Sequence, residues 1–277
     1  MQLILLFYQI YFKLLGLIST RLAAQKAFKL FCTPFNKKVR ERETEILNTA
    51  LKSRFQLTGF SIAKYEWGGG DKTALLVHGW EGNAGSLGGF IPLLANKGYH
   101  VVAFDAPAHG ASDKKQTNFL EFAEVTQQLL RSLQNVEVII AHSFGSAVSL
   151  LSLVRNPQIK IKKLVLLTTP DKLEVPFNDF FAMVKLPLKI QNEIVEMVEK
   201  KYDFKVHEMS AAELSKTLEM DTLFIHDTED KIIPYEFSER VSKSIKGSRL
   251  VALKDVGHYR MLWNEDVIKM VDEFIGN

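Results

Sequence analysis

The stretch that decides the fold is Val136-Glu137-Val138-Ile139-Ile140-Ala141-His142-Ser143-Phe144-Gly145. Its first five residues are rich in β-branched side chains, which is typical of a strand, and the residues after Gly145 are typical of a helix. Ser143 therefore stands on a strand-to-helix turn, with the small residues Ala141 and Gly145 on either side. A sharp turn of this kind holds a serine hydroxyl where a base can reach it. The alternative is a serine that only caps the helix.

Short apolar runs and helix-length stretches alternate on both sides of this turn. The expected strands are residues 74–77, 100–104, 136–141, 164–167, 223–225 and 250–253. The expected helices are residues 87–97, 119–133, 146–155, 236–245 and 266–274. Alternation of strands and helices predicts a mostly parallel sheet that is covered by helices on both faces.

Three further segments complete the organisation of the chain. Residues 60–67 are expected to form a strand, residues 68–70 a glycine-rich hairpin turn after it, and residues 40–54 a charged helix before it. Residues 170–220 interrupt the alternation, because about fifty residues are too many for one crossover connection. This interval is rich in phenylalanine, so we expect a helical cap insertion at about 171–220 that can cover a site.

Two more side chains that suit nucleophilic catalysis follow strands near the end of the chain. His258 lies after the last expected strand and completes the chain order serine, acid, histidine. Asp230 is the predicted partner that orients this histidine, because it lies on the loop beyond a strand, whereas Asp227 is still at the turn itself. All three groups are expected at the carboxyl edge of the sheet, where such sheets place their ligands.

A glycine-rich loop after the first core strand supplies the remaining part of the predicted site. Acyl transfer needs backbone N–H donors where the carbonyl oxygen gains charge, and the candidates are the amides of Trp80 and Phe144. The spacing of Gly79, Gly82 and Gly85 does not fit a dinucleotide fingerprint. Residues 105–112, which include Asp105 and His109, are expected to form a structural loop beside the site.

Taken in order, these motifs resemble the α/β-hydrolase superfamily. The resemblance covers roughly residues 60–275 and rests on His78-Gly79-Trp80, the loop of residues 105–112, the turn of residues 141–145, the loop of Asp230, and Gly257-His258. More narrowly, the chain is similar to a set of bacterial α/β hydrolases without assigned substrates, which also tend to begin with a hydrophobic and basic helical leader. The departures are Ala141, where glycine is usual, and Asp227, where a glycine often precedes the acid loop.

The resemblance implies a cofactor-free hydrolysis by Ser143, His258 and Asp230 through an acyl-enzyme. Metal catalysis is not expected, because the sequence has no His-Glu-x-x-His motif and no close cluster of histidines. The expected substrate is a small-to-medium apolar carboxylic ester, the apolar character being inferred from the phenylalanine-rich insertion. Cleavage of a thioester or of a C–C bond by the same three residues stays open, as does a non-catalytic binding protein on the same fold.

The first part of the chain differs in composition from the rest. Residues 1–40 contain seven basic residues and no acidic one, although the whole chain has a net charge of only +3. Residues 3–18 are almost wholly apolar, and three interpretations are open for them: a helix packed on the protein itself, an interfacial membrane helix, or a membrane span. We divide the chain into a helical leader, residues 1–55, and an α/β-hydrolase domain, residues 56–277.

Composition also limits the partners and the compartment. No nucleic-acid-binding module accompanies the basic residues, so a nucleic acid is not an expected partner. The single cysteine, Cys32, cannot form an internal disulfide, which indicates a reducing compartment and a cytoplasmic protein. Peripheral membrane contact through residues 1–40 is the one macromolecular association that the sequence suggests.

Overall fold

The computed structural model describes residues 2–36 and 38–276, so Lys37, one of the basic residues counted above, lies outside the described residues. The chain divides into two compact units. Met1–Thr33 and Lys172–Ser210 form the first, here called the helical unit, and Pro34–Asp171 with Ala211–Asn277 form the second, the α/β unit. The helical leader is predicted to end at residue 55, whereas the helical unit takes up only the first 33 residues of the chain's beginning. The elements that follow Thr33 belong to the α/β unit, because they pack on the sheet.

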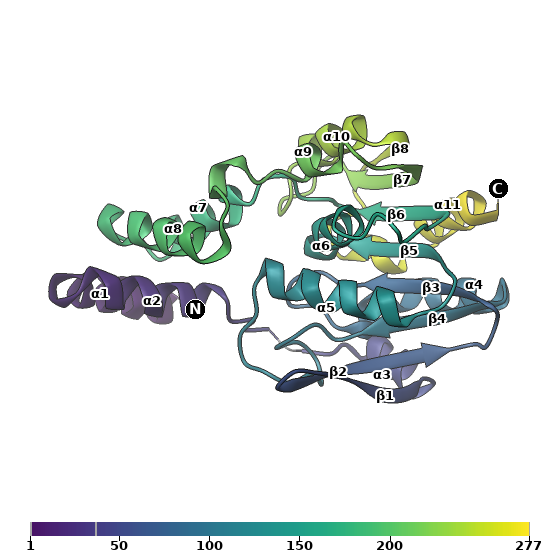
Figure 1. Ribbon diagram of the computed structural model, residues 1–277, viewed down its shortest axis with the longest axis horizontal. Helices are drawn as coiled ribbons and strands as arrows, with labels where there is room; N and C mark the ends of the chain where they lie inside the picture. The colour runs from purple at the N-terminus through teal and green to yellow at the C-terminus, as the bar shows by residue number, and fades with distance from the viewer. Residues whose placement is uncertain (1, 37, 277) are drawn as a thin grey trace. The chain divides into compact units, whose positions relative to one another are not determined.

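An eight-stranded sheet forms the centre of the α/β unit (Figure 1). Its order is β1-β2-β4-β3-β5-β6-β7-β8. The six strands from β3 to β8 are parallel to one another, whereas β2 is antiparallel to both of its neighbours, β1 and β4. The strands are β1 (Leu51–Leu57), β2 (Phe60–Trp67), β3 (Lys72–Val77), β4 (Tyr99–Phe104), β5 (Val136–His142), β6 (Lys163–Leu167), β7 (Glu219–Asp227) and β8 (Lys246–Leu253).

Two apolar cores cover the two faces of this sheet, because side chains alternate along each strand. Val138 and Ile140 of β5 belong to one core, and Ile139 and Ala141 to the other. The first core is closed by α3 (Glu41–Asn48), η1 (Ala84–Phe90), α4 (Ile91–Asn96), η3 (Arg260–Trp263) and α11 (Glu265–Gly276). The second is closed by α5 (Phe119–Ser132), α6 (Phe144–Val154), α9 (Ala211–Ser215) and α10 (Tyr235–Ser244).

This architecture is the predicted α/β-hydrolase fold, and all six expected core strands are present. Two local predictions are wrong. The expected helix of residues 40–54 ends at Asn48, and Leu51 already begins β1, because pairing with β2 overrides the local helical preference. The glycines at 68–70 do not form a hairpin turn, since β2 pairs with β4 and not with β3, the next strand along the chain.

The helical unit combines two segments that are far apart in the sequence, the leader and the insertion. Its elements are α1 (Gln2–Ile18), α2 (Thr20–Phe31), α7 (Glu174–Met183), α8 (Leu188–Tyr202) and η2 (Val206–Glu208). One core unites them, and it contains Phe12 and three alanines of α2 together with the insertion residues Phe177, Phe180, Phe181, Ile190, Ile194 and Val198. In the described part of the chain, no helix has both the length and the apolar character needed to cross a membrane.

The phenylalanines of the insertion therefore have a structural role. Phe177, Phe180 and Phe181 are each less than a tenth exposed and pack against the leader helices. Phe31 of α2 lies against both Phe177 and Phe180, with ring centroids 4.7 and 5.3 Å apart. These three rings form the interior of the helical unit, so the apolar substrate inferred from them needs other support.

Candidate active site

Ser143 lies between β5 and α6 in a backbone conformation that few residues adopt. Its φ is 52° and its ψ is −123°, and a non-glycine residue with such a positive φ persists only where its surroundings enforce it. Two backbone hydrogen bonds hold this conformation. The Ser143 N–H donates to the carbonyl oxygen of Leu167 in β6 (2.8 Å), and the Ser143 carbonyl accepts from the Ser146 N–H (2.8 Å). The turn thus fixes the serine at the carboxyl end of the sheet.

The residues flanking the turn are small because neighbouring backbone approaches them closely. A Cβ atom on Gly145 would overlap the carbonyl oxygens of Val77 and His78, which follow from β3. A Cβ on Gly79 would lie 3.1 Å from the Cβ of Ser143. Ala141, the departure from the usual glycine, is fully buried in the sheet. The close approach of the loop after β3 to the serine turn therefore requires glycine at position 145 and leaves little room at position 79.

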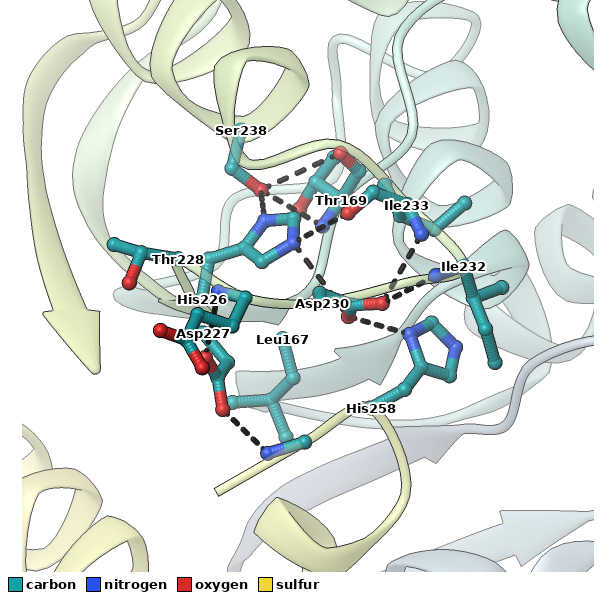
Figure 2. Close-up of polar contacts among 12 residues, drawn as sticks. Leu167, Thr169, His226, Asp227, Thr228, Asp230, Ile232, Ile233, Ser238 and His258 are labelled. Carbon is teal, nitrogen blue, oxygen red and sulfur yellow. Dashed lines mark hydrogen bonds and ion pairs between the residues drawn. The ribbon is translucent and has the colours of Figure 1, made fainter. Parts of the chain in front are cut away.

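His258 and Asp230, from the loops after β8 and β7, are brought together (Figure 2). His258 Nδ1 lies 2.7 Å from Asp230 Oδ2, and the other carboxylate oxygen accepts from the N–H groups of Ile232 (2.8 Å) and Ile233 (3.1 Å). Because the carboxylate can only accept when ionised, the His258 Nδ1 carries a proton and donates it. That tautomer leaves Nε2 able to take a proton from a hydroxyl.

The electrostatics of the pair keep Asp230 ionised. Its side chain is fully buried, and burial by itself works to raise the pKa of the carboxyl. The rings of His226 and His258 and the Ile232 N–H outweigh that effect, so the pKa of Asp230 is held far below its ordinary value. An orienting carboxylate must stay charged throughout the reaction, and this environment suits that requirement.

Asp227, the rejected candidate, has a different task. Its carboxylate accepts from the backbone N–H groups of Gly257 (2.5 Å) and Glu229 (2.8 Å). Burial works to raise the pKa of Asp227, but these backbone donors lower it on balance. Asp227 thus ties the loop after β7 to the loop after β8, one residue before His258.

His226 is a neighbour of Asp230 to which the sequence analysis assigns no role. Its Nε2 lies 3.6 Å from Asp230 Oδ2 and donates to the carbonyl oxygen of Ile233 (3.0 Å), while its Nδ1 accepts from the hydroxyl of Ser238 (2.7 Å). Figure 2 shows the His226 ring between Ser238 and the carboxylate. The only signal in the sequence was its position at the end of a strand, four residues before Asp230.

The serine turn and the His258 loop meet through His142. The His142 Nε2 donates to the carbonyl oxygen of His258 (3.0 Å), and the two ring centroids are 4.8 Å apart. Since His142 directly precedes Ser143, this contact brings the predicted nucleophile and base to the same edge of the sheet. Within the described residues, no hydrogen bond joins the Ser143 hydroxyl to the His258 ring. The structure thus pairs Asp230 with His258 and places Ser143 on the adjoining loop.

The two predicted oxyanion donors lie on adjoining loops. The side-chain rings of Trp80 and Phe144 are in edge contact, with centroids 5.4 Å apart. Neither backbone N–H donates to a protein acceptor in the described part of the chain. The turn that carries Trp80 is closed by the Gly82 N–H, which donates to the carbonyl oxygen of Gly79 (3.0 Å). Both N–H groups are therefore without a protein acceptor among the described residues, as donors to an oxyanion must be.

Buried side chains after β3 and β4 hold these loops in place. His78 donates from Nδ1 to the Gly79 carbonyl (2.7 Å) and accepts at Nε2 from the Ala106 N–H (3.0 Å). Asp105 accepts from the N–H groups of Ala84 (2.7 Å) and Ala111 (2.8 Å), and His109 Nε2 accepts from the Glu81 N–H (3.1 Å). Asp105 and His109 therefore make the structural contacts that the sequence analysis expects of their loop.

Two glutamates that the sequence analysis does not single out connect the loop of Trp80 to the segment before β1. Glu81 accepts from the N–H groups of Phe35 (2.8 Å) and Asn36 (3.1 Å). Glu43 of α3 is buried and accepts from the side-chain amide of Asn83 (3.1 Å). Because the partners lie about forty residues apart in the sequence, no local pattern could have revealed these contacts.

Comparisons with known proteins agree with this fold. Residues 73–191 match the family model of the alpha/beta hydrolase fold, and residues 195–277 match a model described as TAP-like protein. The chain is 23% identical over 267 residues to the uncharacterized hydrolase YugF of Bacillus subtilis (strain 168), which covers 81% of this chain and 96% of that protein. A serine hydrolase-like protein of Homo sapiens is 34% identical over 115 residues, 39% of this chain and 56% of that protein.

A solved structure resembles most of the chain. Alpha/beta hydrolase domain-containing protein 10 from mouse superposes with a TM-score of 0.63 at 17% identity, over 82% of this chain and 97% of that one. That likeness shows the fold. The two family models together span residues 73–191 and 195–277, and they show that the chain belongs to the α/β-hydrolase superfamily. The chain thus has the fold of a hydrolase, and the relatives given above are described as hydrolases or as similar to hydrolases.

Proposed function

We propose that the protein is a serine hydrolase that cleaves a carboxylic ester with a small-to-medium apolar acyl group. The observation that carries the proposal is the buried Asp230–His258 pair. His142, which precedes the serine turn, donates to the carbonyl oxygen of the same His258. A positive φ at a buried serine is costly, about 1–3 kcal/mol, and persists at functional sites where that conformation presents the side chain.

The reaction would proceed in two steps. His258 Nε2 takes the proton of the Ser143 hydroxyl as its oxygen attacks the ester carbonyl, and the N–H groups of Trp80 and Phe144 stabilise the oxyanion. His258 then protonates the leaving alcohol, which departs from the acyl-enzyme. A water molecule, deprotonated by the same nitrogen, releases the carboxylic acid and restores Ser143. Each oxyanion donor should contribute roughly 100- to 1000-fold in rate.

The preference for an apolar substrate rests on aromatic side chains beside the serine. Phe144 follows Ser143 directly, and its ring contacts the rings of Trp80 and Phe119 at centroid distances of 5.4 and 5.6 Å. These rings replace the insertion phenylalanines as the reason to expect an apolar acyl group, because the latter are used up in the core of the helical unit.

The test is turnover of p-nitrophenyl esters by the wild type and two serine variants. Ser143→Ala should abolish turnover, whereas Ser149→Ala should keep it, because Ser149 lies in the same helix and donates to the carbonyl of Gly145. Survival of activity in Ser143→Ala would refute the assignment. Lack of labelling of the wild type by a fluorophosphonate probe would favour a non-catalytic binding protein instead.

Thioesters and C–C bonds next to a carbonyl are the alternative substrates, since the same three residues can cleave them. A panel of p-nitrophenyl esters of increasing acyl length, measured against acyl thioesters of the same lengths, distinguishes an esterase from a thioesterase. Higher kcat/KM for the esters at every chain length is the expected result.

A further inference from the structure

The face of α1 that points away from its own unit is apolar and exposed. Phe12 is the only buried residue of this helix. The exposed large apolar side chains of α1 are Leu3, Ile4, Leu6, Phe7, Ile10, Tyr11, Leu14, Leu17 and Ile18. At 3.6 residues per turn they fall within an arc of about 160°, roughly opposite Phe12. Contiguous apolar surface on this scale marks an interaction site.

Polar residues border this arc on one side only. Gln2, Gln9 and Lys13 project between the buried face and the exposed apolar face. The Gln9 side-chain amide donates to the carbonyl oxygen of Met183 (3.2 Å), which places the α7–α8 connection beside α1. That connection adds the exposed side chains of Met183 and Leu188. The helix thus has one face in the protein core, an apolar face outside, and a polar border between them.

Unpaired positive charges accompany the apolar face. The two leader helices carry Lys13, Arg21, Lys26 and Lys29 and no acidic residue. All four side chains are exposed, as are Lys185 and Lys189 of the α7–α8 connection. None of these six cations has an ion-pair partner among the described residues. An exposed apolar arc on a pair of helices whose only charges are basic complements an anionic lipid surface better than it complements a neutral protein.

We propose that the helical unit docks on the surface of an anionic lipid bilayer, with α1 lying in the plane of the interface. One side of α1 is committed to Phe12 and its neighbours, so the opposite side can enter the headgroup region while the lysines stay near the phosphates. The helix of 17 residues would lie along about 26 Å of the surface. This inference is independent of the proposed ester hydrolysis.

The experiment is co-sedimentation of the full-length protein with vesicles, without any substrate. Vesicles of pure phosphatidylcholine are compared with vesicles that contain about one quarter phosphatidylglycerol. The protein should sediment with the anionic vesicles, and added salt should weaken the binding. Leu14→Glu should lower the partition coefficient at least about tenfold, since it replaces a leucine that the lipid would bury with an acid at the anionic interface.

The matched control is Leu51→Glu, the same chemical change at an exposed leucine of β1 in the α/β unit. It should bind vesicles like the wild type. The double variant Lys26→Gln and Lys29→Gln should lower the partition coefficient roughly tenfold on anionic vesicles and should change it little on neutral vesicles.

Three outcomes would overturn the proposal. The first is equal binding by Leu14→Glu and Leu51→Glu, or no binding by the wild type. The second is a concentration-dependent dimer in sedimentation velocity that Leu14→Glu abolishes, which would assign the face to a second copy. The third is a clear drop in the melting temperature of Leu14→Glu without lipid, which would show that the protein itself covers this face.

Discussion

Two histidines near the serine turn, His78 and His142, are buried as neutral rings. Burial lowers the pKa of His78 to about 4. Burial, together with the nearby His258, lowers the pKa of His142 to about 3. Each pKa is lower in the folded protein than in the unfolded chain, where it is about 6.5. Below that pH the unfolded chain binds more protons, so the stability these rings provide is lost as the pH falls towards 4 and 3.

The magnitude follows from proton linkage. At pH 4, each ring should cost about 3 kcal/mol of unfolding free energy relative to pH 7, a large fraction of the stability of a typical domain. Between about pH 6 and pH 4.5, each group adds about 1.0–1.3 kcal/mol per pH unit to the slope of stability against pH, because nearly one proton is taken up on unfolding.

His142→Gln isolates one of these contributions. Unfolding free energies of the wild type and the variant are measured by urea denaturation, followed by tryptophan fluorescence, across that pH range. The slope should be shallower in His142→Gln by about 1.2 kcal/mol per pH unit, because nearly one proton fewer is taken up on unfolding. Parallel slopes would refute the conclusion that His142 is held neutral by the fold.

Three further substitutions test single contacts. Asp230→Asn should lower kcat about 1000- to 10,000-fold in the p-nitrophenyl ester assay, because the neutral amide no longer fixes the His258 tautomer. Asp227→Asn should lower the melting temperature and change kcat much less, because Asp227 only ties two loops together. If Asp227→Asn lowered kcat more than Asp230→Asn does, the two roles would have to be exchanged. Gly145→Ala should cost about 1–3 kcal/mol or more in urea denaturation, since its methyl group meets backbone carbonyls, and an unchanged midpoint would contradict the close approach. Glu43→Ala should cost about 1–3 kcal/mol, because it leaves the buried Asn83 amide without its acceptor, and a loss near zero would show that this contact is dispensable.

The helical unit shows where local patterns stop being informative. The apolar periodicity of residues 3–18 predicts a helix, and α1 is that helix. The pattern cannot say which side of the helix is buried, because almost every side is apolar. Phe12 is selected by packing with α2 and the insertion, whose residues lie some 165 positions further along the chain. For the same reason the pattern does not reveal that the insertion phenylalanines lie in this core.

The amino-acid sequence by itself determined the alternation of strands and helices, the strand-to-helix turn at Ser143 and the order in which Asp230 and His258 follow it. These features depend on contacts within a few residues, so their periodicity and turn chemistry can be read directly. Only the tertiary structure decided that Leu51–Leu57 is a strand, that His226 stands beside Asp230, and that Glu43 and Glu81 hold the loop of Trp80. Those choices follow from closing the whole sheet, because a hydrogen-bond partner forty residues away is fixed by the fold and not by its neighbours in the chain.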